Sequence, residues 1–249
     1  MSKRQGYTWN IARIRAAALV VVAVLAAYFA VRLAVLPRLE QQKIQEQQTA
    51  LLESIRKGDG VLALDDSLTD GAVDFYDGGD QAPAEEAALF APLLETSAVS
   101  AAVEDGEEAS TSVDTGVVGG TGILTIDSIG LELPVIEGVS GAQLKISVGH
   151  VPQTAAIGDT GNAVIAGHRS YTYGEHFNRL GEVVVGDEIR YLSIGGEEMV
   201  FVVDEILEVL PGDQAAFAQP EDKAQLTLYT CTPIRTATHR LLVRATRTI

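Results

Sequence analysis

Short apolar stretches separated by turn residues fill the C-terminal half of the chain. In Leu226–Cys231, for example, Leu226 and Leu228 alternate with polar or aromatic residues. A period of two is typical of strands whose two faces meet different surroundings. Many short strands at close spacing predict a mostly β domain with a few short helices over residues 121–249, either a closed barrel or a sandwich.

The order of the runs gives the expected elements of this domain. Strands are expected at Ile123–Ile126, Leu131–Ile136, Asn162–Gly167, Val183–Ile194, Met199–Leu210, Leu226–Cys231 and Arg240–Thr246. Short helices are expected at Ala142–Val148 and Gly174–Leu180. The first two strands are joined by a short segment that ends in Gly, a hairpin-like pattern, and the fourth and fifth are joined through two consecutive Gly.

The N-terminal segment carries a different pattern. Ala16–Val31 is an uncharged run of 16 residues, which as a helix is about 24 Å long against a hydrocarbon core of roughly 30 Å. Arg32 can extend its side chain to the lipid surface, so the span can continue to Leu36. We expect a single-pass transmembrane signal anchor at residues 16–36, with a cleaved signal peptide and a buried core helix as alternatives.

Two segments with different compositions connect the anchor to the β domain. Residues 37–57 are rich in Gln, Glu and Leu, with no Gly or Pro between 38 and 56, which predicts a juxtamembrane helix. Residues 58–120 are rich in Asp, Glu, Gly, Ala and Ser and predict an acidic disordered stalk. The small apolar island at residues 89–94 is either an isolated helical fragment or a segment that docks on the folded domain.

The net charge of −16 is unevenly distributed along the chain. Residues 1–36 carry +5, residues 37–120 carry −14 and residues 121–249 carry −7. The basic residues before the apolar run predict a cytoplasmic N-terminus at residues 1–15, with the β domain outside the cell. No cluster of Lys and Arg marks a nucleic-acid surface, so we expect no nucleic-acid partner.

Cys231 is the only cysteine, which excludes an intrachain disulfide and a Cys-rich zinc site. It ends one predicted strand, Arg240 begins the next, and the loop Thr232–His239 joins them, so the two side chains can lie side by side. Positive charge favours the nucleophilic thiolate, and a guanidinium offers donors to an oxyanion. The alternative is a buried structural cysteine near a surface arginine.

A cysteine nucleophile requires a histidine that is near it in space. His168 is favoured among the four histidines, because an apolar strand delivers it to a strand end that is followed by a polar loop. His150, which follows a similar Gly, and His239, which lies beside Arg240, remain alternatives.

Three motifs together resemble the sortases, the cysteine transpeptidases of Gram-positive cell surfaces. They are AGHR at Ala166–Arg169, TLYTC at Thr227–Cys231 and HR at His239–Arg240, and the likeness covers Gly122–Arg247. The sequence around these motifs is most similar to class D. Pilus-building class C enzymes share the stretch from Cys231 to Arg240. They usually carry an Asp-Pro-aromatic lid motif and often a second membrane span, neither of which is found in this sequence.

The resemblance implies a closed eight-stranded sortase-type β-barrel, with His168, Cys231 and Arg240 as the catalytic residues. It further implies that Thr230 and Ile234 bind substrate. No cofactor and no metal are expected. Of the remaining histidines, His239 is expected to pack beside the site, His150 to be structural or to line the site, and His176 to lie on the surface of a short helix. The acidic residues Glu182, Asp187 and Glu188 are interpreted as a solvated face rather than a calcium site.

The implied reaction is transpeptidation of an LPXTG-like sorting signal. Cys231 as thiolate attacks the carbonyl of the Thr–Gly bond, Arg240 stabilises the oxyanion, and His168 as imidazolium protonates the leaving amine. The resulting thioacyl enzyme is resolved by a cell-wall precursor amine. The expected partners are therefore LPXTG-like surface proteins and that amine, at the outer face of the cell membrane. A class C-like pilin polymerase, an inactive tethered binding domain and a hydrolytic cysteine protease are the alternatives.

Overall fold

The computed structural model describes residues 17–29, 31, 36–63, 117–170 and 174–248. The predicted stalk between residues 64 and 116, with its apolar island, lies outside these ranges. Contacts divide the chain into two compact units, Met1–Glu46 and Gln47–Ile249.

The first unit is helical where it is described. Residues 17–29 form one helix, and α2 (Leu36–Arg56) begins in this unit and continues into the second, against a predicted range of 37–57. Among the residues that the structure describes, no helix combines the length and the hydropathy needed to cross a membrane. The predicted span at residues 16–36 is described only in part, because residues 16, 30 and 32–35 lie outside the described ranges.

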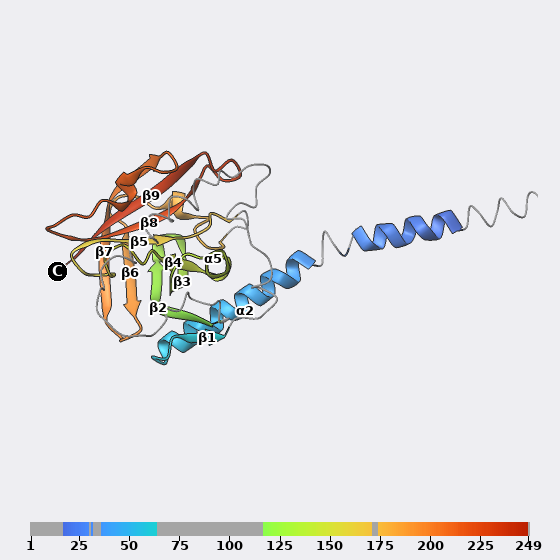
Figure 1. Ribbon diagram of the computed structural model, residues 1–249, viewed down its shortest axis with the longest axis horizontal. Coiled ribbons are helices and arrows are strands. Elements are labelled where there is room, and N and C mark those ends of the chain that lie inside the picture. The colour runs from blue at the N-terminus through green and yellow to red at the C-terminus, as the bar shows by residue number, and fades with distance from the viewer. Residues whose placement is uncertain (1–16, 30, 32–35, 64–116, 171–173, 249) are drawn as a thin grey trace, which may run out of the picture. The chain divides into compact units, whose positions relative to one another are not determined.

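Eight strands of the second unit form a closed barrel, as predicted (Figure 1). They are β2 (Val117–Ile126), β3 (Leu131–Glu137), β4 (Val148–His150), β5 (Gly161–Ala166), β6 (Glu188–Ser193), β7 (Glu198–Val209), β8 (Ala224–Thr232) and β9 (His239–Arg247). Their order around the barrel is β2-β3-β4-β5-β8-β9-β7-β6, and pairing of β6 with β2 closes it. The β3–β4 and β5–β8 pairs are parallel and the others are antiparallel.

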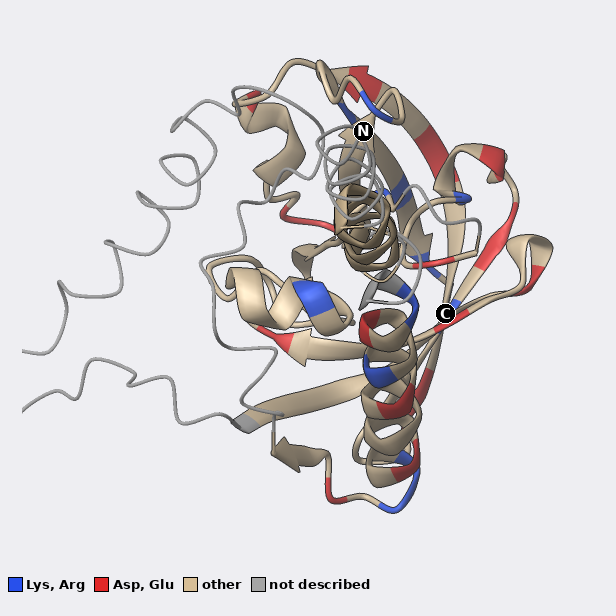
Figure 2. Cartoon of the chain, turned by 90° about the vertical axis from the view of Figure 1, so that its right-hand side faces the viewer, with Lys and Arg blue, Asp and Glu red and all other residues tan. Residues whose placement is uncertain are grey.

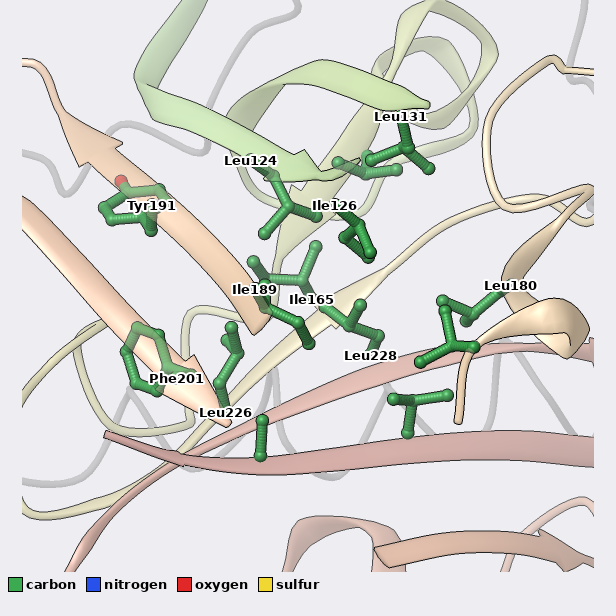
Figure 3. Packing of buried hydrophobic residues seen from close by; sticks show 14 of the residues in the cluster. Leu124, Ile126, Leu131, Ile165, Leu180, Ile189, Tyr191, Phe201, Leu226 and Leu228 are labelled. Carbon is green, nitrogen blue, oxygen red and sulfur yellow. The ribbon is translucent and has the colours of Figure 1, made fainter. Parts of the chain in front are cut away.

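The barrel interior is filled by apolar side chains from every wall (Figure 3). Leu124 of β2, Ile165 of β5, Ile189 of β6, Phe201 of β7 and Leu228 of β8 all belong to this main cluster. Residues two apart along a strand share a face, so each strand turns one such set of side chains towards the barrel interior. The period-two pattern in the sequence therefore has its cause in barrel packing.

A second apolar cluster covers the outer face of β5, β8 and β9. It contains Ala166, Tyr229 and Leu242, with Phe217 from the 3-10 turn η5 (Gln214–Phe217) packed against them. These three strands are thus buried on both faces, which explains why β5 is apolar along most of its length. In the view of Figure 2, acidic and basic residues are interspersed over strands, loops and helices rather than gathered by sign.

The domain begins earlier than the predicted boundary at residue 121. The short strand β1 (Val61–Ala63) pairs antiparallel with residues 117–119 of β2, although residues 58–120 were predicted to be disordered. Leu51 and Ile55 of α2 are buried in a third apolar cluster with β2, β3 and α5 (Gly141–Ile146). A three-residue strand has too little local pattern to be recognised, because its stability comes from the partner strand.

One predicted helix is wrong and another is confirmed. Residues 174–179 form turns, followed by the 3-10 turn η4 (Leu180–Glu182), because positive φ angles at Gly174 (83°) and His176 (43°) are incompatible with a right-handed helix. The predicted helical turn at Ala142–Val148 corresponds to α5, which begins with a reciprocal capping box between Ser140 and Gln143.

Candidate active site

The register of three adjacent strands brings the predicted site residues to one level. Cys231 of β8 and Arg240 of β9 are direct antiparallel partners, and such partners have Cβ atoms about 4.5–5.5 Å apart. On the other side of β8, Ala166 of β5 pairs with Tyr229, and the Gly167 N–H donates to the Tyr229 carbonyl at 3.1 Å. Continuing this parallel register places His168 level with Cys231.

The three side chains also project from the same face. Ala166, Tyr229 and Leu242 share the outer cluster. Two residues further towards this end of each strand come His168, Cys231 and Arg240, and strand alternation keeps each on the face of its predecessor. The site therefore lies on the outside of the barrel, where Cys231 is partly exposed.

The guanidinium of Arg240 is buried and fixed by the loop that precedes it. The side chain is 1% exposed, and its Nη1 donates to the carbonyl oxygens of Ala237 at 2.9 Å and His239 at 3.0 Å. A buried cation beside a thiol favours the thiolate, because the charge is poorly screened by water. The same group is suited to stabilise the oxyanion that forms when the sulfur attacks a carbonyl carbon.

His168 is held as a neutral imidazole at the end of β5. Burial, and after it the charge of His176, lowers the pKa of His168 to about 4. The two imidazole centroids are 6.3 Å apart. The carbonyl of His168 also accepts a hydrogen bond from Phe177 N–H at 3.0 Å, so the turn that carries His176 is tied to the backbone of His168.

His176 is part of the site's surroundings, which the sequence did not indicate. It was expected on the surface of a helix, but it is partly buried in a turn, and its Nε2 lies 3.3 Å from the carbonyl oxygen of Ile146. Because a carbonyl only accepts, Nε2 carries the proton of this contact. Burial lowers the pKa of His176, while Ile146 and Glu175 act in the opposite direction.

Arg169, the last residue of the AGHR motif, also lies close to the site, although no role was expected for it. Its Nη1 donates to Thr232 Oγ1 at 2.7 Å, so it links the residue after His168 to the residue after Cys231. The Thr232 hydroxyl in turn donates to Glu208 Oε1 at 3.3 Å.

Comparison with known families identifies the family of this chain. A family model described as a sortase domain matches residues 124–248, half of the chain. The chain belongs to the sortase family. Sortases are transpeptidases.

Three similar proteins show how far the likeness extends. Sortase D of Bacillus subtilis (strain 168) is 34% identical over 113 residues, which cover 45% of this chain and 54% of that protein. Sortase A from Corynebacterium diphtheriae has a TM-score of 0.52 at 29% identity, covering 68% of this chain and 86% of that one. Sortase C1 from Streptococcus suis has a TM-score of 0.50 at 31% identity, covering 52% and 73%. The chain thus spans about half the length of the Bacillus relative.

His150 of the sortase domain is held between a carboxylate and a backbone carbonyl. Its Nδ1 lies 3.0 Å from a carboxylate oxygen of Glu137, and its Nε2 lies 2.9 Å from the carbonyl of Ala155. Both partners are acceptors, so both ring nitrogens must carry protons. Burial opposes this charge, but the hydrogen bond and the charge of Glu137 outweigh it and raise the pKa of His150. His150 thus joins β3 to β4.

The two residues expected to bind substrate are placed differently in the sortase domain. Thr230 is 1% exposed and its hydroxyl donates to the carbonyl of Gly167 at 2.7 Å. Alternation turns Thr230 to the face opposite Cys231, where it ties β8 to β5, and its role towards substrate stays a prediction. Ile234 is 39% exposed in the loop between β8 and β9, and its contact with substrate stays a prediction.

Two of the three acidic residues considered for calcium have protein partners in the sortase domain. Glu182 forms an ion pair with Arg179 at 2.7 Å, and Asp187 accepts a hydrogen bond from Ser128 at 2.9 Å.

His239 pairs with Thr232 in the β8–β9 register, so it alternates away from Arg240 and Cys231.

Proposed function

We propose that this sortase cleaves an LPXTG-like sorting signal between Thr and Gly and transfers the new carbonyl end to a cell-wall amine. The observation that carries the proposal is the alignment of His168, Cys231 and Arg240 at the ends of three adjacent strands. The sequence likeness to a Sortase D favours a class D enzyme.

The first half of the reaction starts from a neutral His168 imidazole and a neutral Cys231 thiol. Because the pKa of His168 is about 4, its imidazole is uncharged at neutral pH and acts first as a base. It takes the proton of the Cys231 thiol as sulfur attacks the Thr carbonyl. Arg240 stabilises the tetrahedral oxyanion. His168 then gives the same proton to the departing glycine amine as the C–N bond breaks.

The second half transfers the acyl group. An acceptor amine attacks the thioester carbonyl, His168 removes a proton from the amine, and the C–S bond breaks as the new amide forms. The proton returns to the sulfur, which restores the neutral pair. Because the two groups exchange one proton, their titration belongs to the pair rather than to either residue.

We propose further that the N-terminal segment anchors the enzyme in the cell membrane, with the barrel on the outer side. The support is the uncharged run of 16 residues, the charge of +5 in residues 1–36 and the −14 that follows. The large apolar side chains of the helix at residues 17–29 are exposed, with Leu19 at 70% and Phe29 at 58%, as expected for side chains whose partner is lipid.

The test uses the full chain in detergent with LPXTG-like peptides and several amines, followed by mass spectrometry. We expect an acyl adduct on the wild type, none on Cys231→Ala, and a transpeptidation product when amine is present. Hydrolysis without transfer would favour a cysteine protease, and absence of any adduct would favour a binding domain. Preference for a pilin-derived lysine over a cell-wall amine would favour the class C alternative.

A further inference from the structure

Arg169 couples the two segments that carry the proposed base and nucleophile. It follows His168 directly, and its Nη1 donates at 2.7 Å to the hydroxyl of Thr232, the residue after Cys231. Thr232 is 3% exposed, so this contact is shielded from water. One guanidinium thus links the segment after β5 to the end of β8, the strand that carries the thiol.

The guanidinium is confined in a way that a simple structural tether does not require. A Cβ at Gly181 would meet Arg169 Nη2, so the guanidinium packs closely against the backbone of Gly181. Arg169 Nε is buried, and none of the described residues accepts a hydrogen bond from it. Such a donor costs free energy, whereas a smaller neutral donor would suffice to hold Thr232.

The charge of Arg169 reaches Cys231. Burial lowers the pKa of Arg169, and the negative charges of Glu208 and of the Cys231 thiolate act in the opposite direction. On the two sides of Cys231, His168 follows β5 and Arg240 begins β9, whereas Arg169 and Glu208 both contact Thr232, the next residue along β8. A His168 whose pKa is about 4 is a weak base, so proton transfer from sulfur needs nearby cations that make the thiol more acidic.

We propose that Arg169 is a positioning residue that stabilises the Cys231 thiolate by its charge and fixes Cys231 through Thr232, while Arg240 serves the oxyanion. This rests on the proposed function only in so far as Cys231 is the nucleophile. Glu208 is exposed, and its negative charge partly offsets the stabilisation of the Cys231 thiolate by Arg169.

The test measures the rate of Cys231 alkylation by iodoacetamide against pH in the full chain. Because Cys231 is the only cysteine, the signal reports one thiol. Arg169→Met should lower the alkylation rate at pH 7 about tenfold, the equivalent of a rise of about one unit in the apparent pKa of the thiol. The plateau at high pH should be unchanged. Arg169→Lys, which keeps the charge, should stay close to the wild type.

Two further variants make the result decisive. Glu208→Gln should shift the alkylation curve in the opposite direction, to lower pH, and it does not depend on the folding of Arg169→Met. Arg190→Met is the matched control, because it removes an arginine that pairs with Asp127 at 2.7 Å and should leave the curve unchanged.

The proposal is overturned if Arg169→Met changes only the plateau or the KM for peptide, or if Arg169→Lys is as impaired as Arg169→Met. Either result would assign Arg169 a structural role alone. Alkylation needs no substrate, so failure of the peptide assay would count against the proposed reaction and not against this inference.

Discussion

Replacing His176 with Gln should raise the pKa of His168. Gln keeps an N–H that can donate to the Ile146 carbonyl, which His176 Nε2 contacts at 3.3 Å, and it removes the titrating ring. The charge of His176 is the second cause, after burial, of the low pKa of His168. Without it, only burial opposes protonation of His168.

The size of this change follows from the whole shift. The pKa of His168 is lowered from 6.5 to about 4, which at 1.36 kcal/mol per unit is about 3 kcal/mol. Burial is the larger part, so His176 accounts for less than half, and the variant should raise the pKa by up to about one unit. A neutral imidazole is the active base, so the acid limb of kcat/KM should move to higher pH by the same amount.

The assay is an NMR titration of the His168 ring protons, with the pH profile of peptide cleavage beside it. His239→Gln is the control, since His239 alternates away from the thiol, and it should leave the His168 titration in place. An unchanged or lower pKa of His168 in His176→Gln would refute the reasoning, because it would mean that the charge of His176 does not act on His168.

Two further predictions concern stability. Leu51→Ala in α2 should lower the free energy of unfolding by about 2–5 kcal/mol, measured by urea denaturation, because Leu51 is fully buried; a loss below 1 kcal/mol would mean that α2 is not needed by the barrel. Glu137→Gln should cost about 1–3 kcal/mol at pH 6, because His150 would lose its carboxylate partner. The raised pKa of His150 implies stabilisation that is present below pH 6.5 and lost as pH rises through the folded-state pKa, so the difference between wild type and variant should shrink at pH 9; a constant difference would contradict the ion pair.

The sequence determined most of what is local in this protein. Period-two alternation is a property of a single strand, so the β8 and β9 strands could be predicted from residues within each of them. Cys231 and Arg240 are separated by one short loop, and two antiparallel strands joined by a short loop must lie side by side. Their pairing in the register therefore followed from the sequence.

Tertiary structure decided every relation across long stretches of chain. The parallel pairing of β5 with β8 brings Gly167 to Thr230, 63 residues apart, and with it His168 to the level of Cys231; from the residues alone, His168 was one candidate among others. The same pairing turns Thr230 inward and brings Arg169 to Thr232, also 63 residues away. β1 and the buried residues of α2 depend on partners beyond residue 116. Closure of the barrel fixes these neighbours, because it holds each central strand between two others and leaves only one face for each side chain.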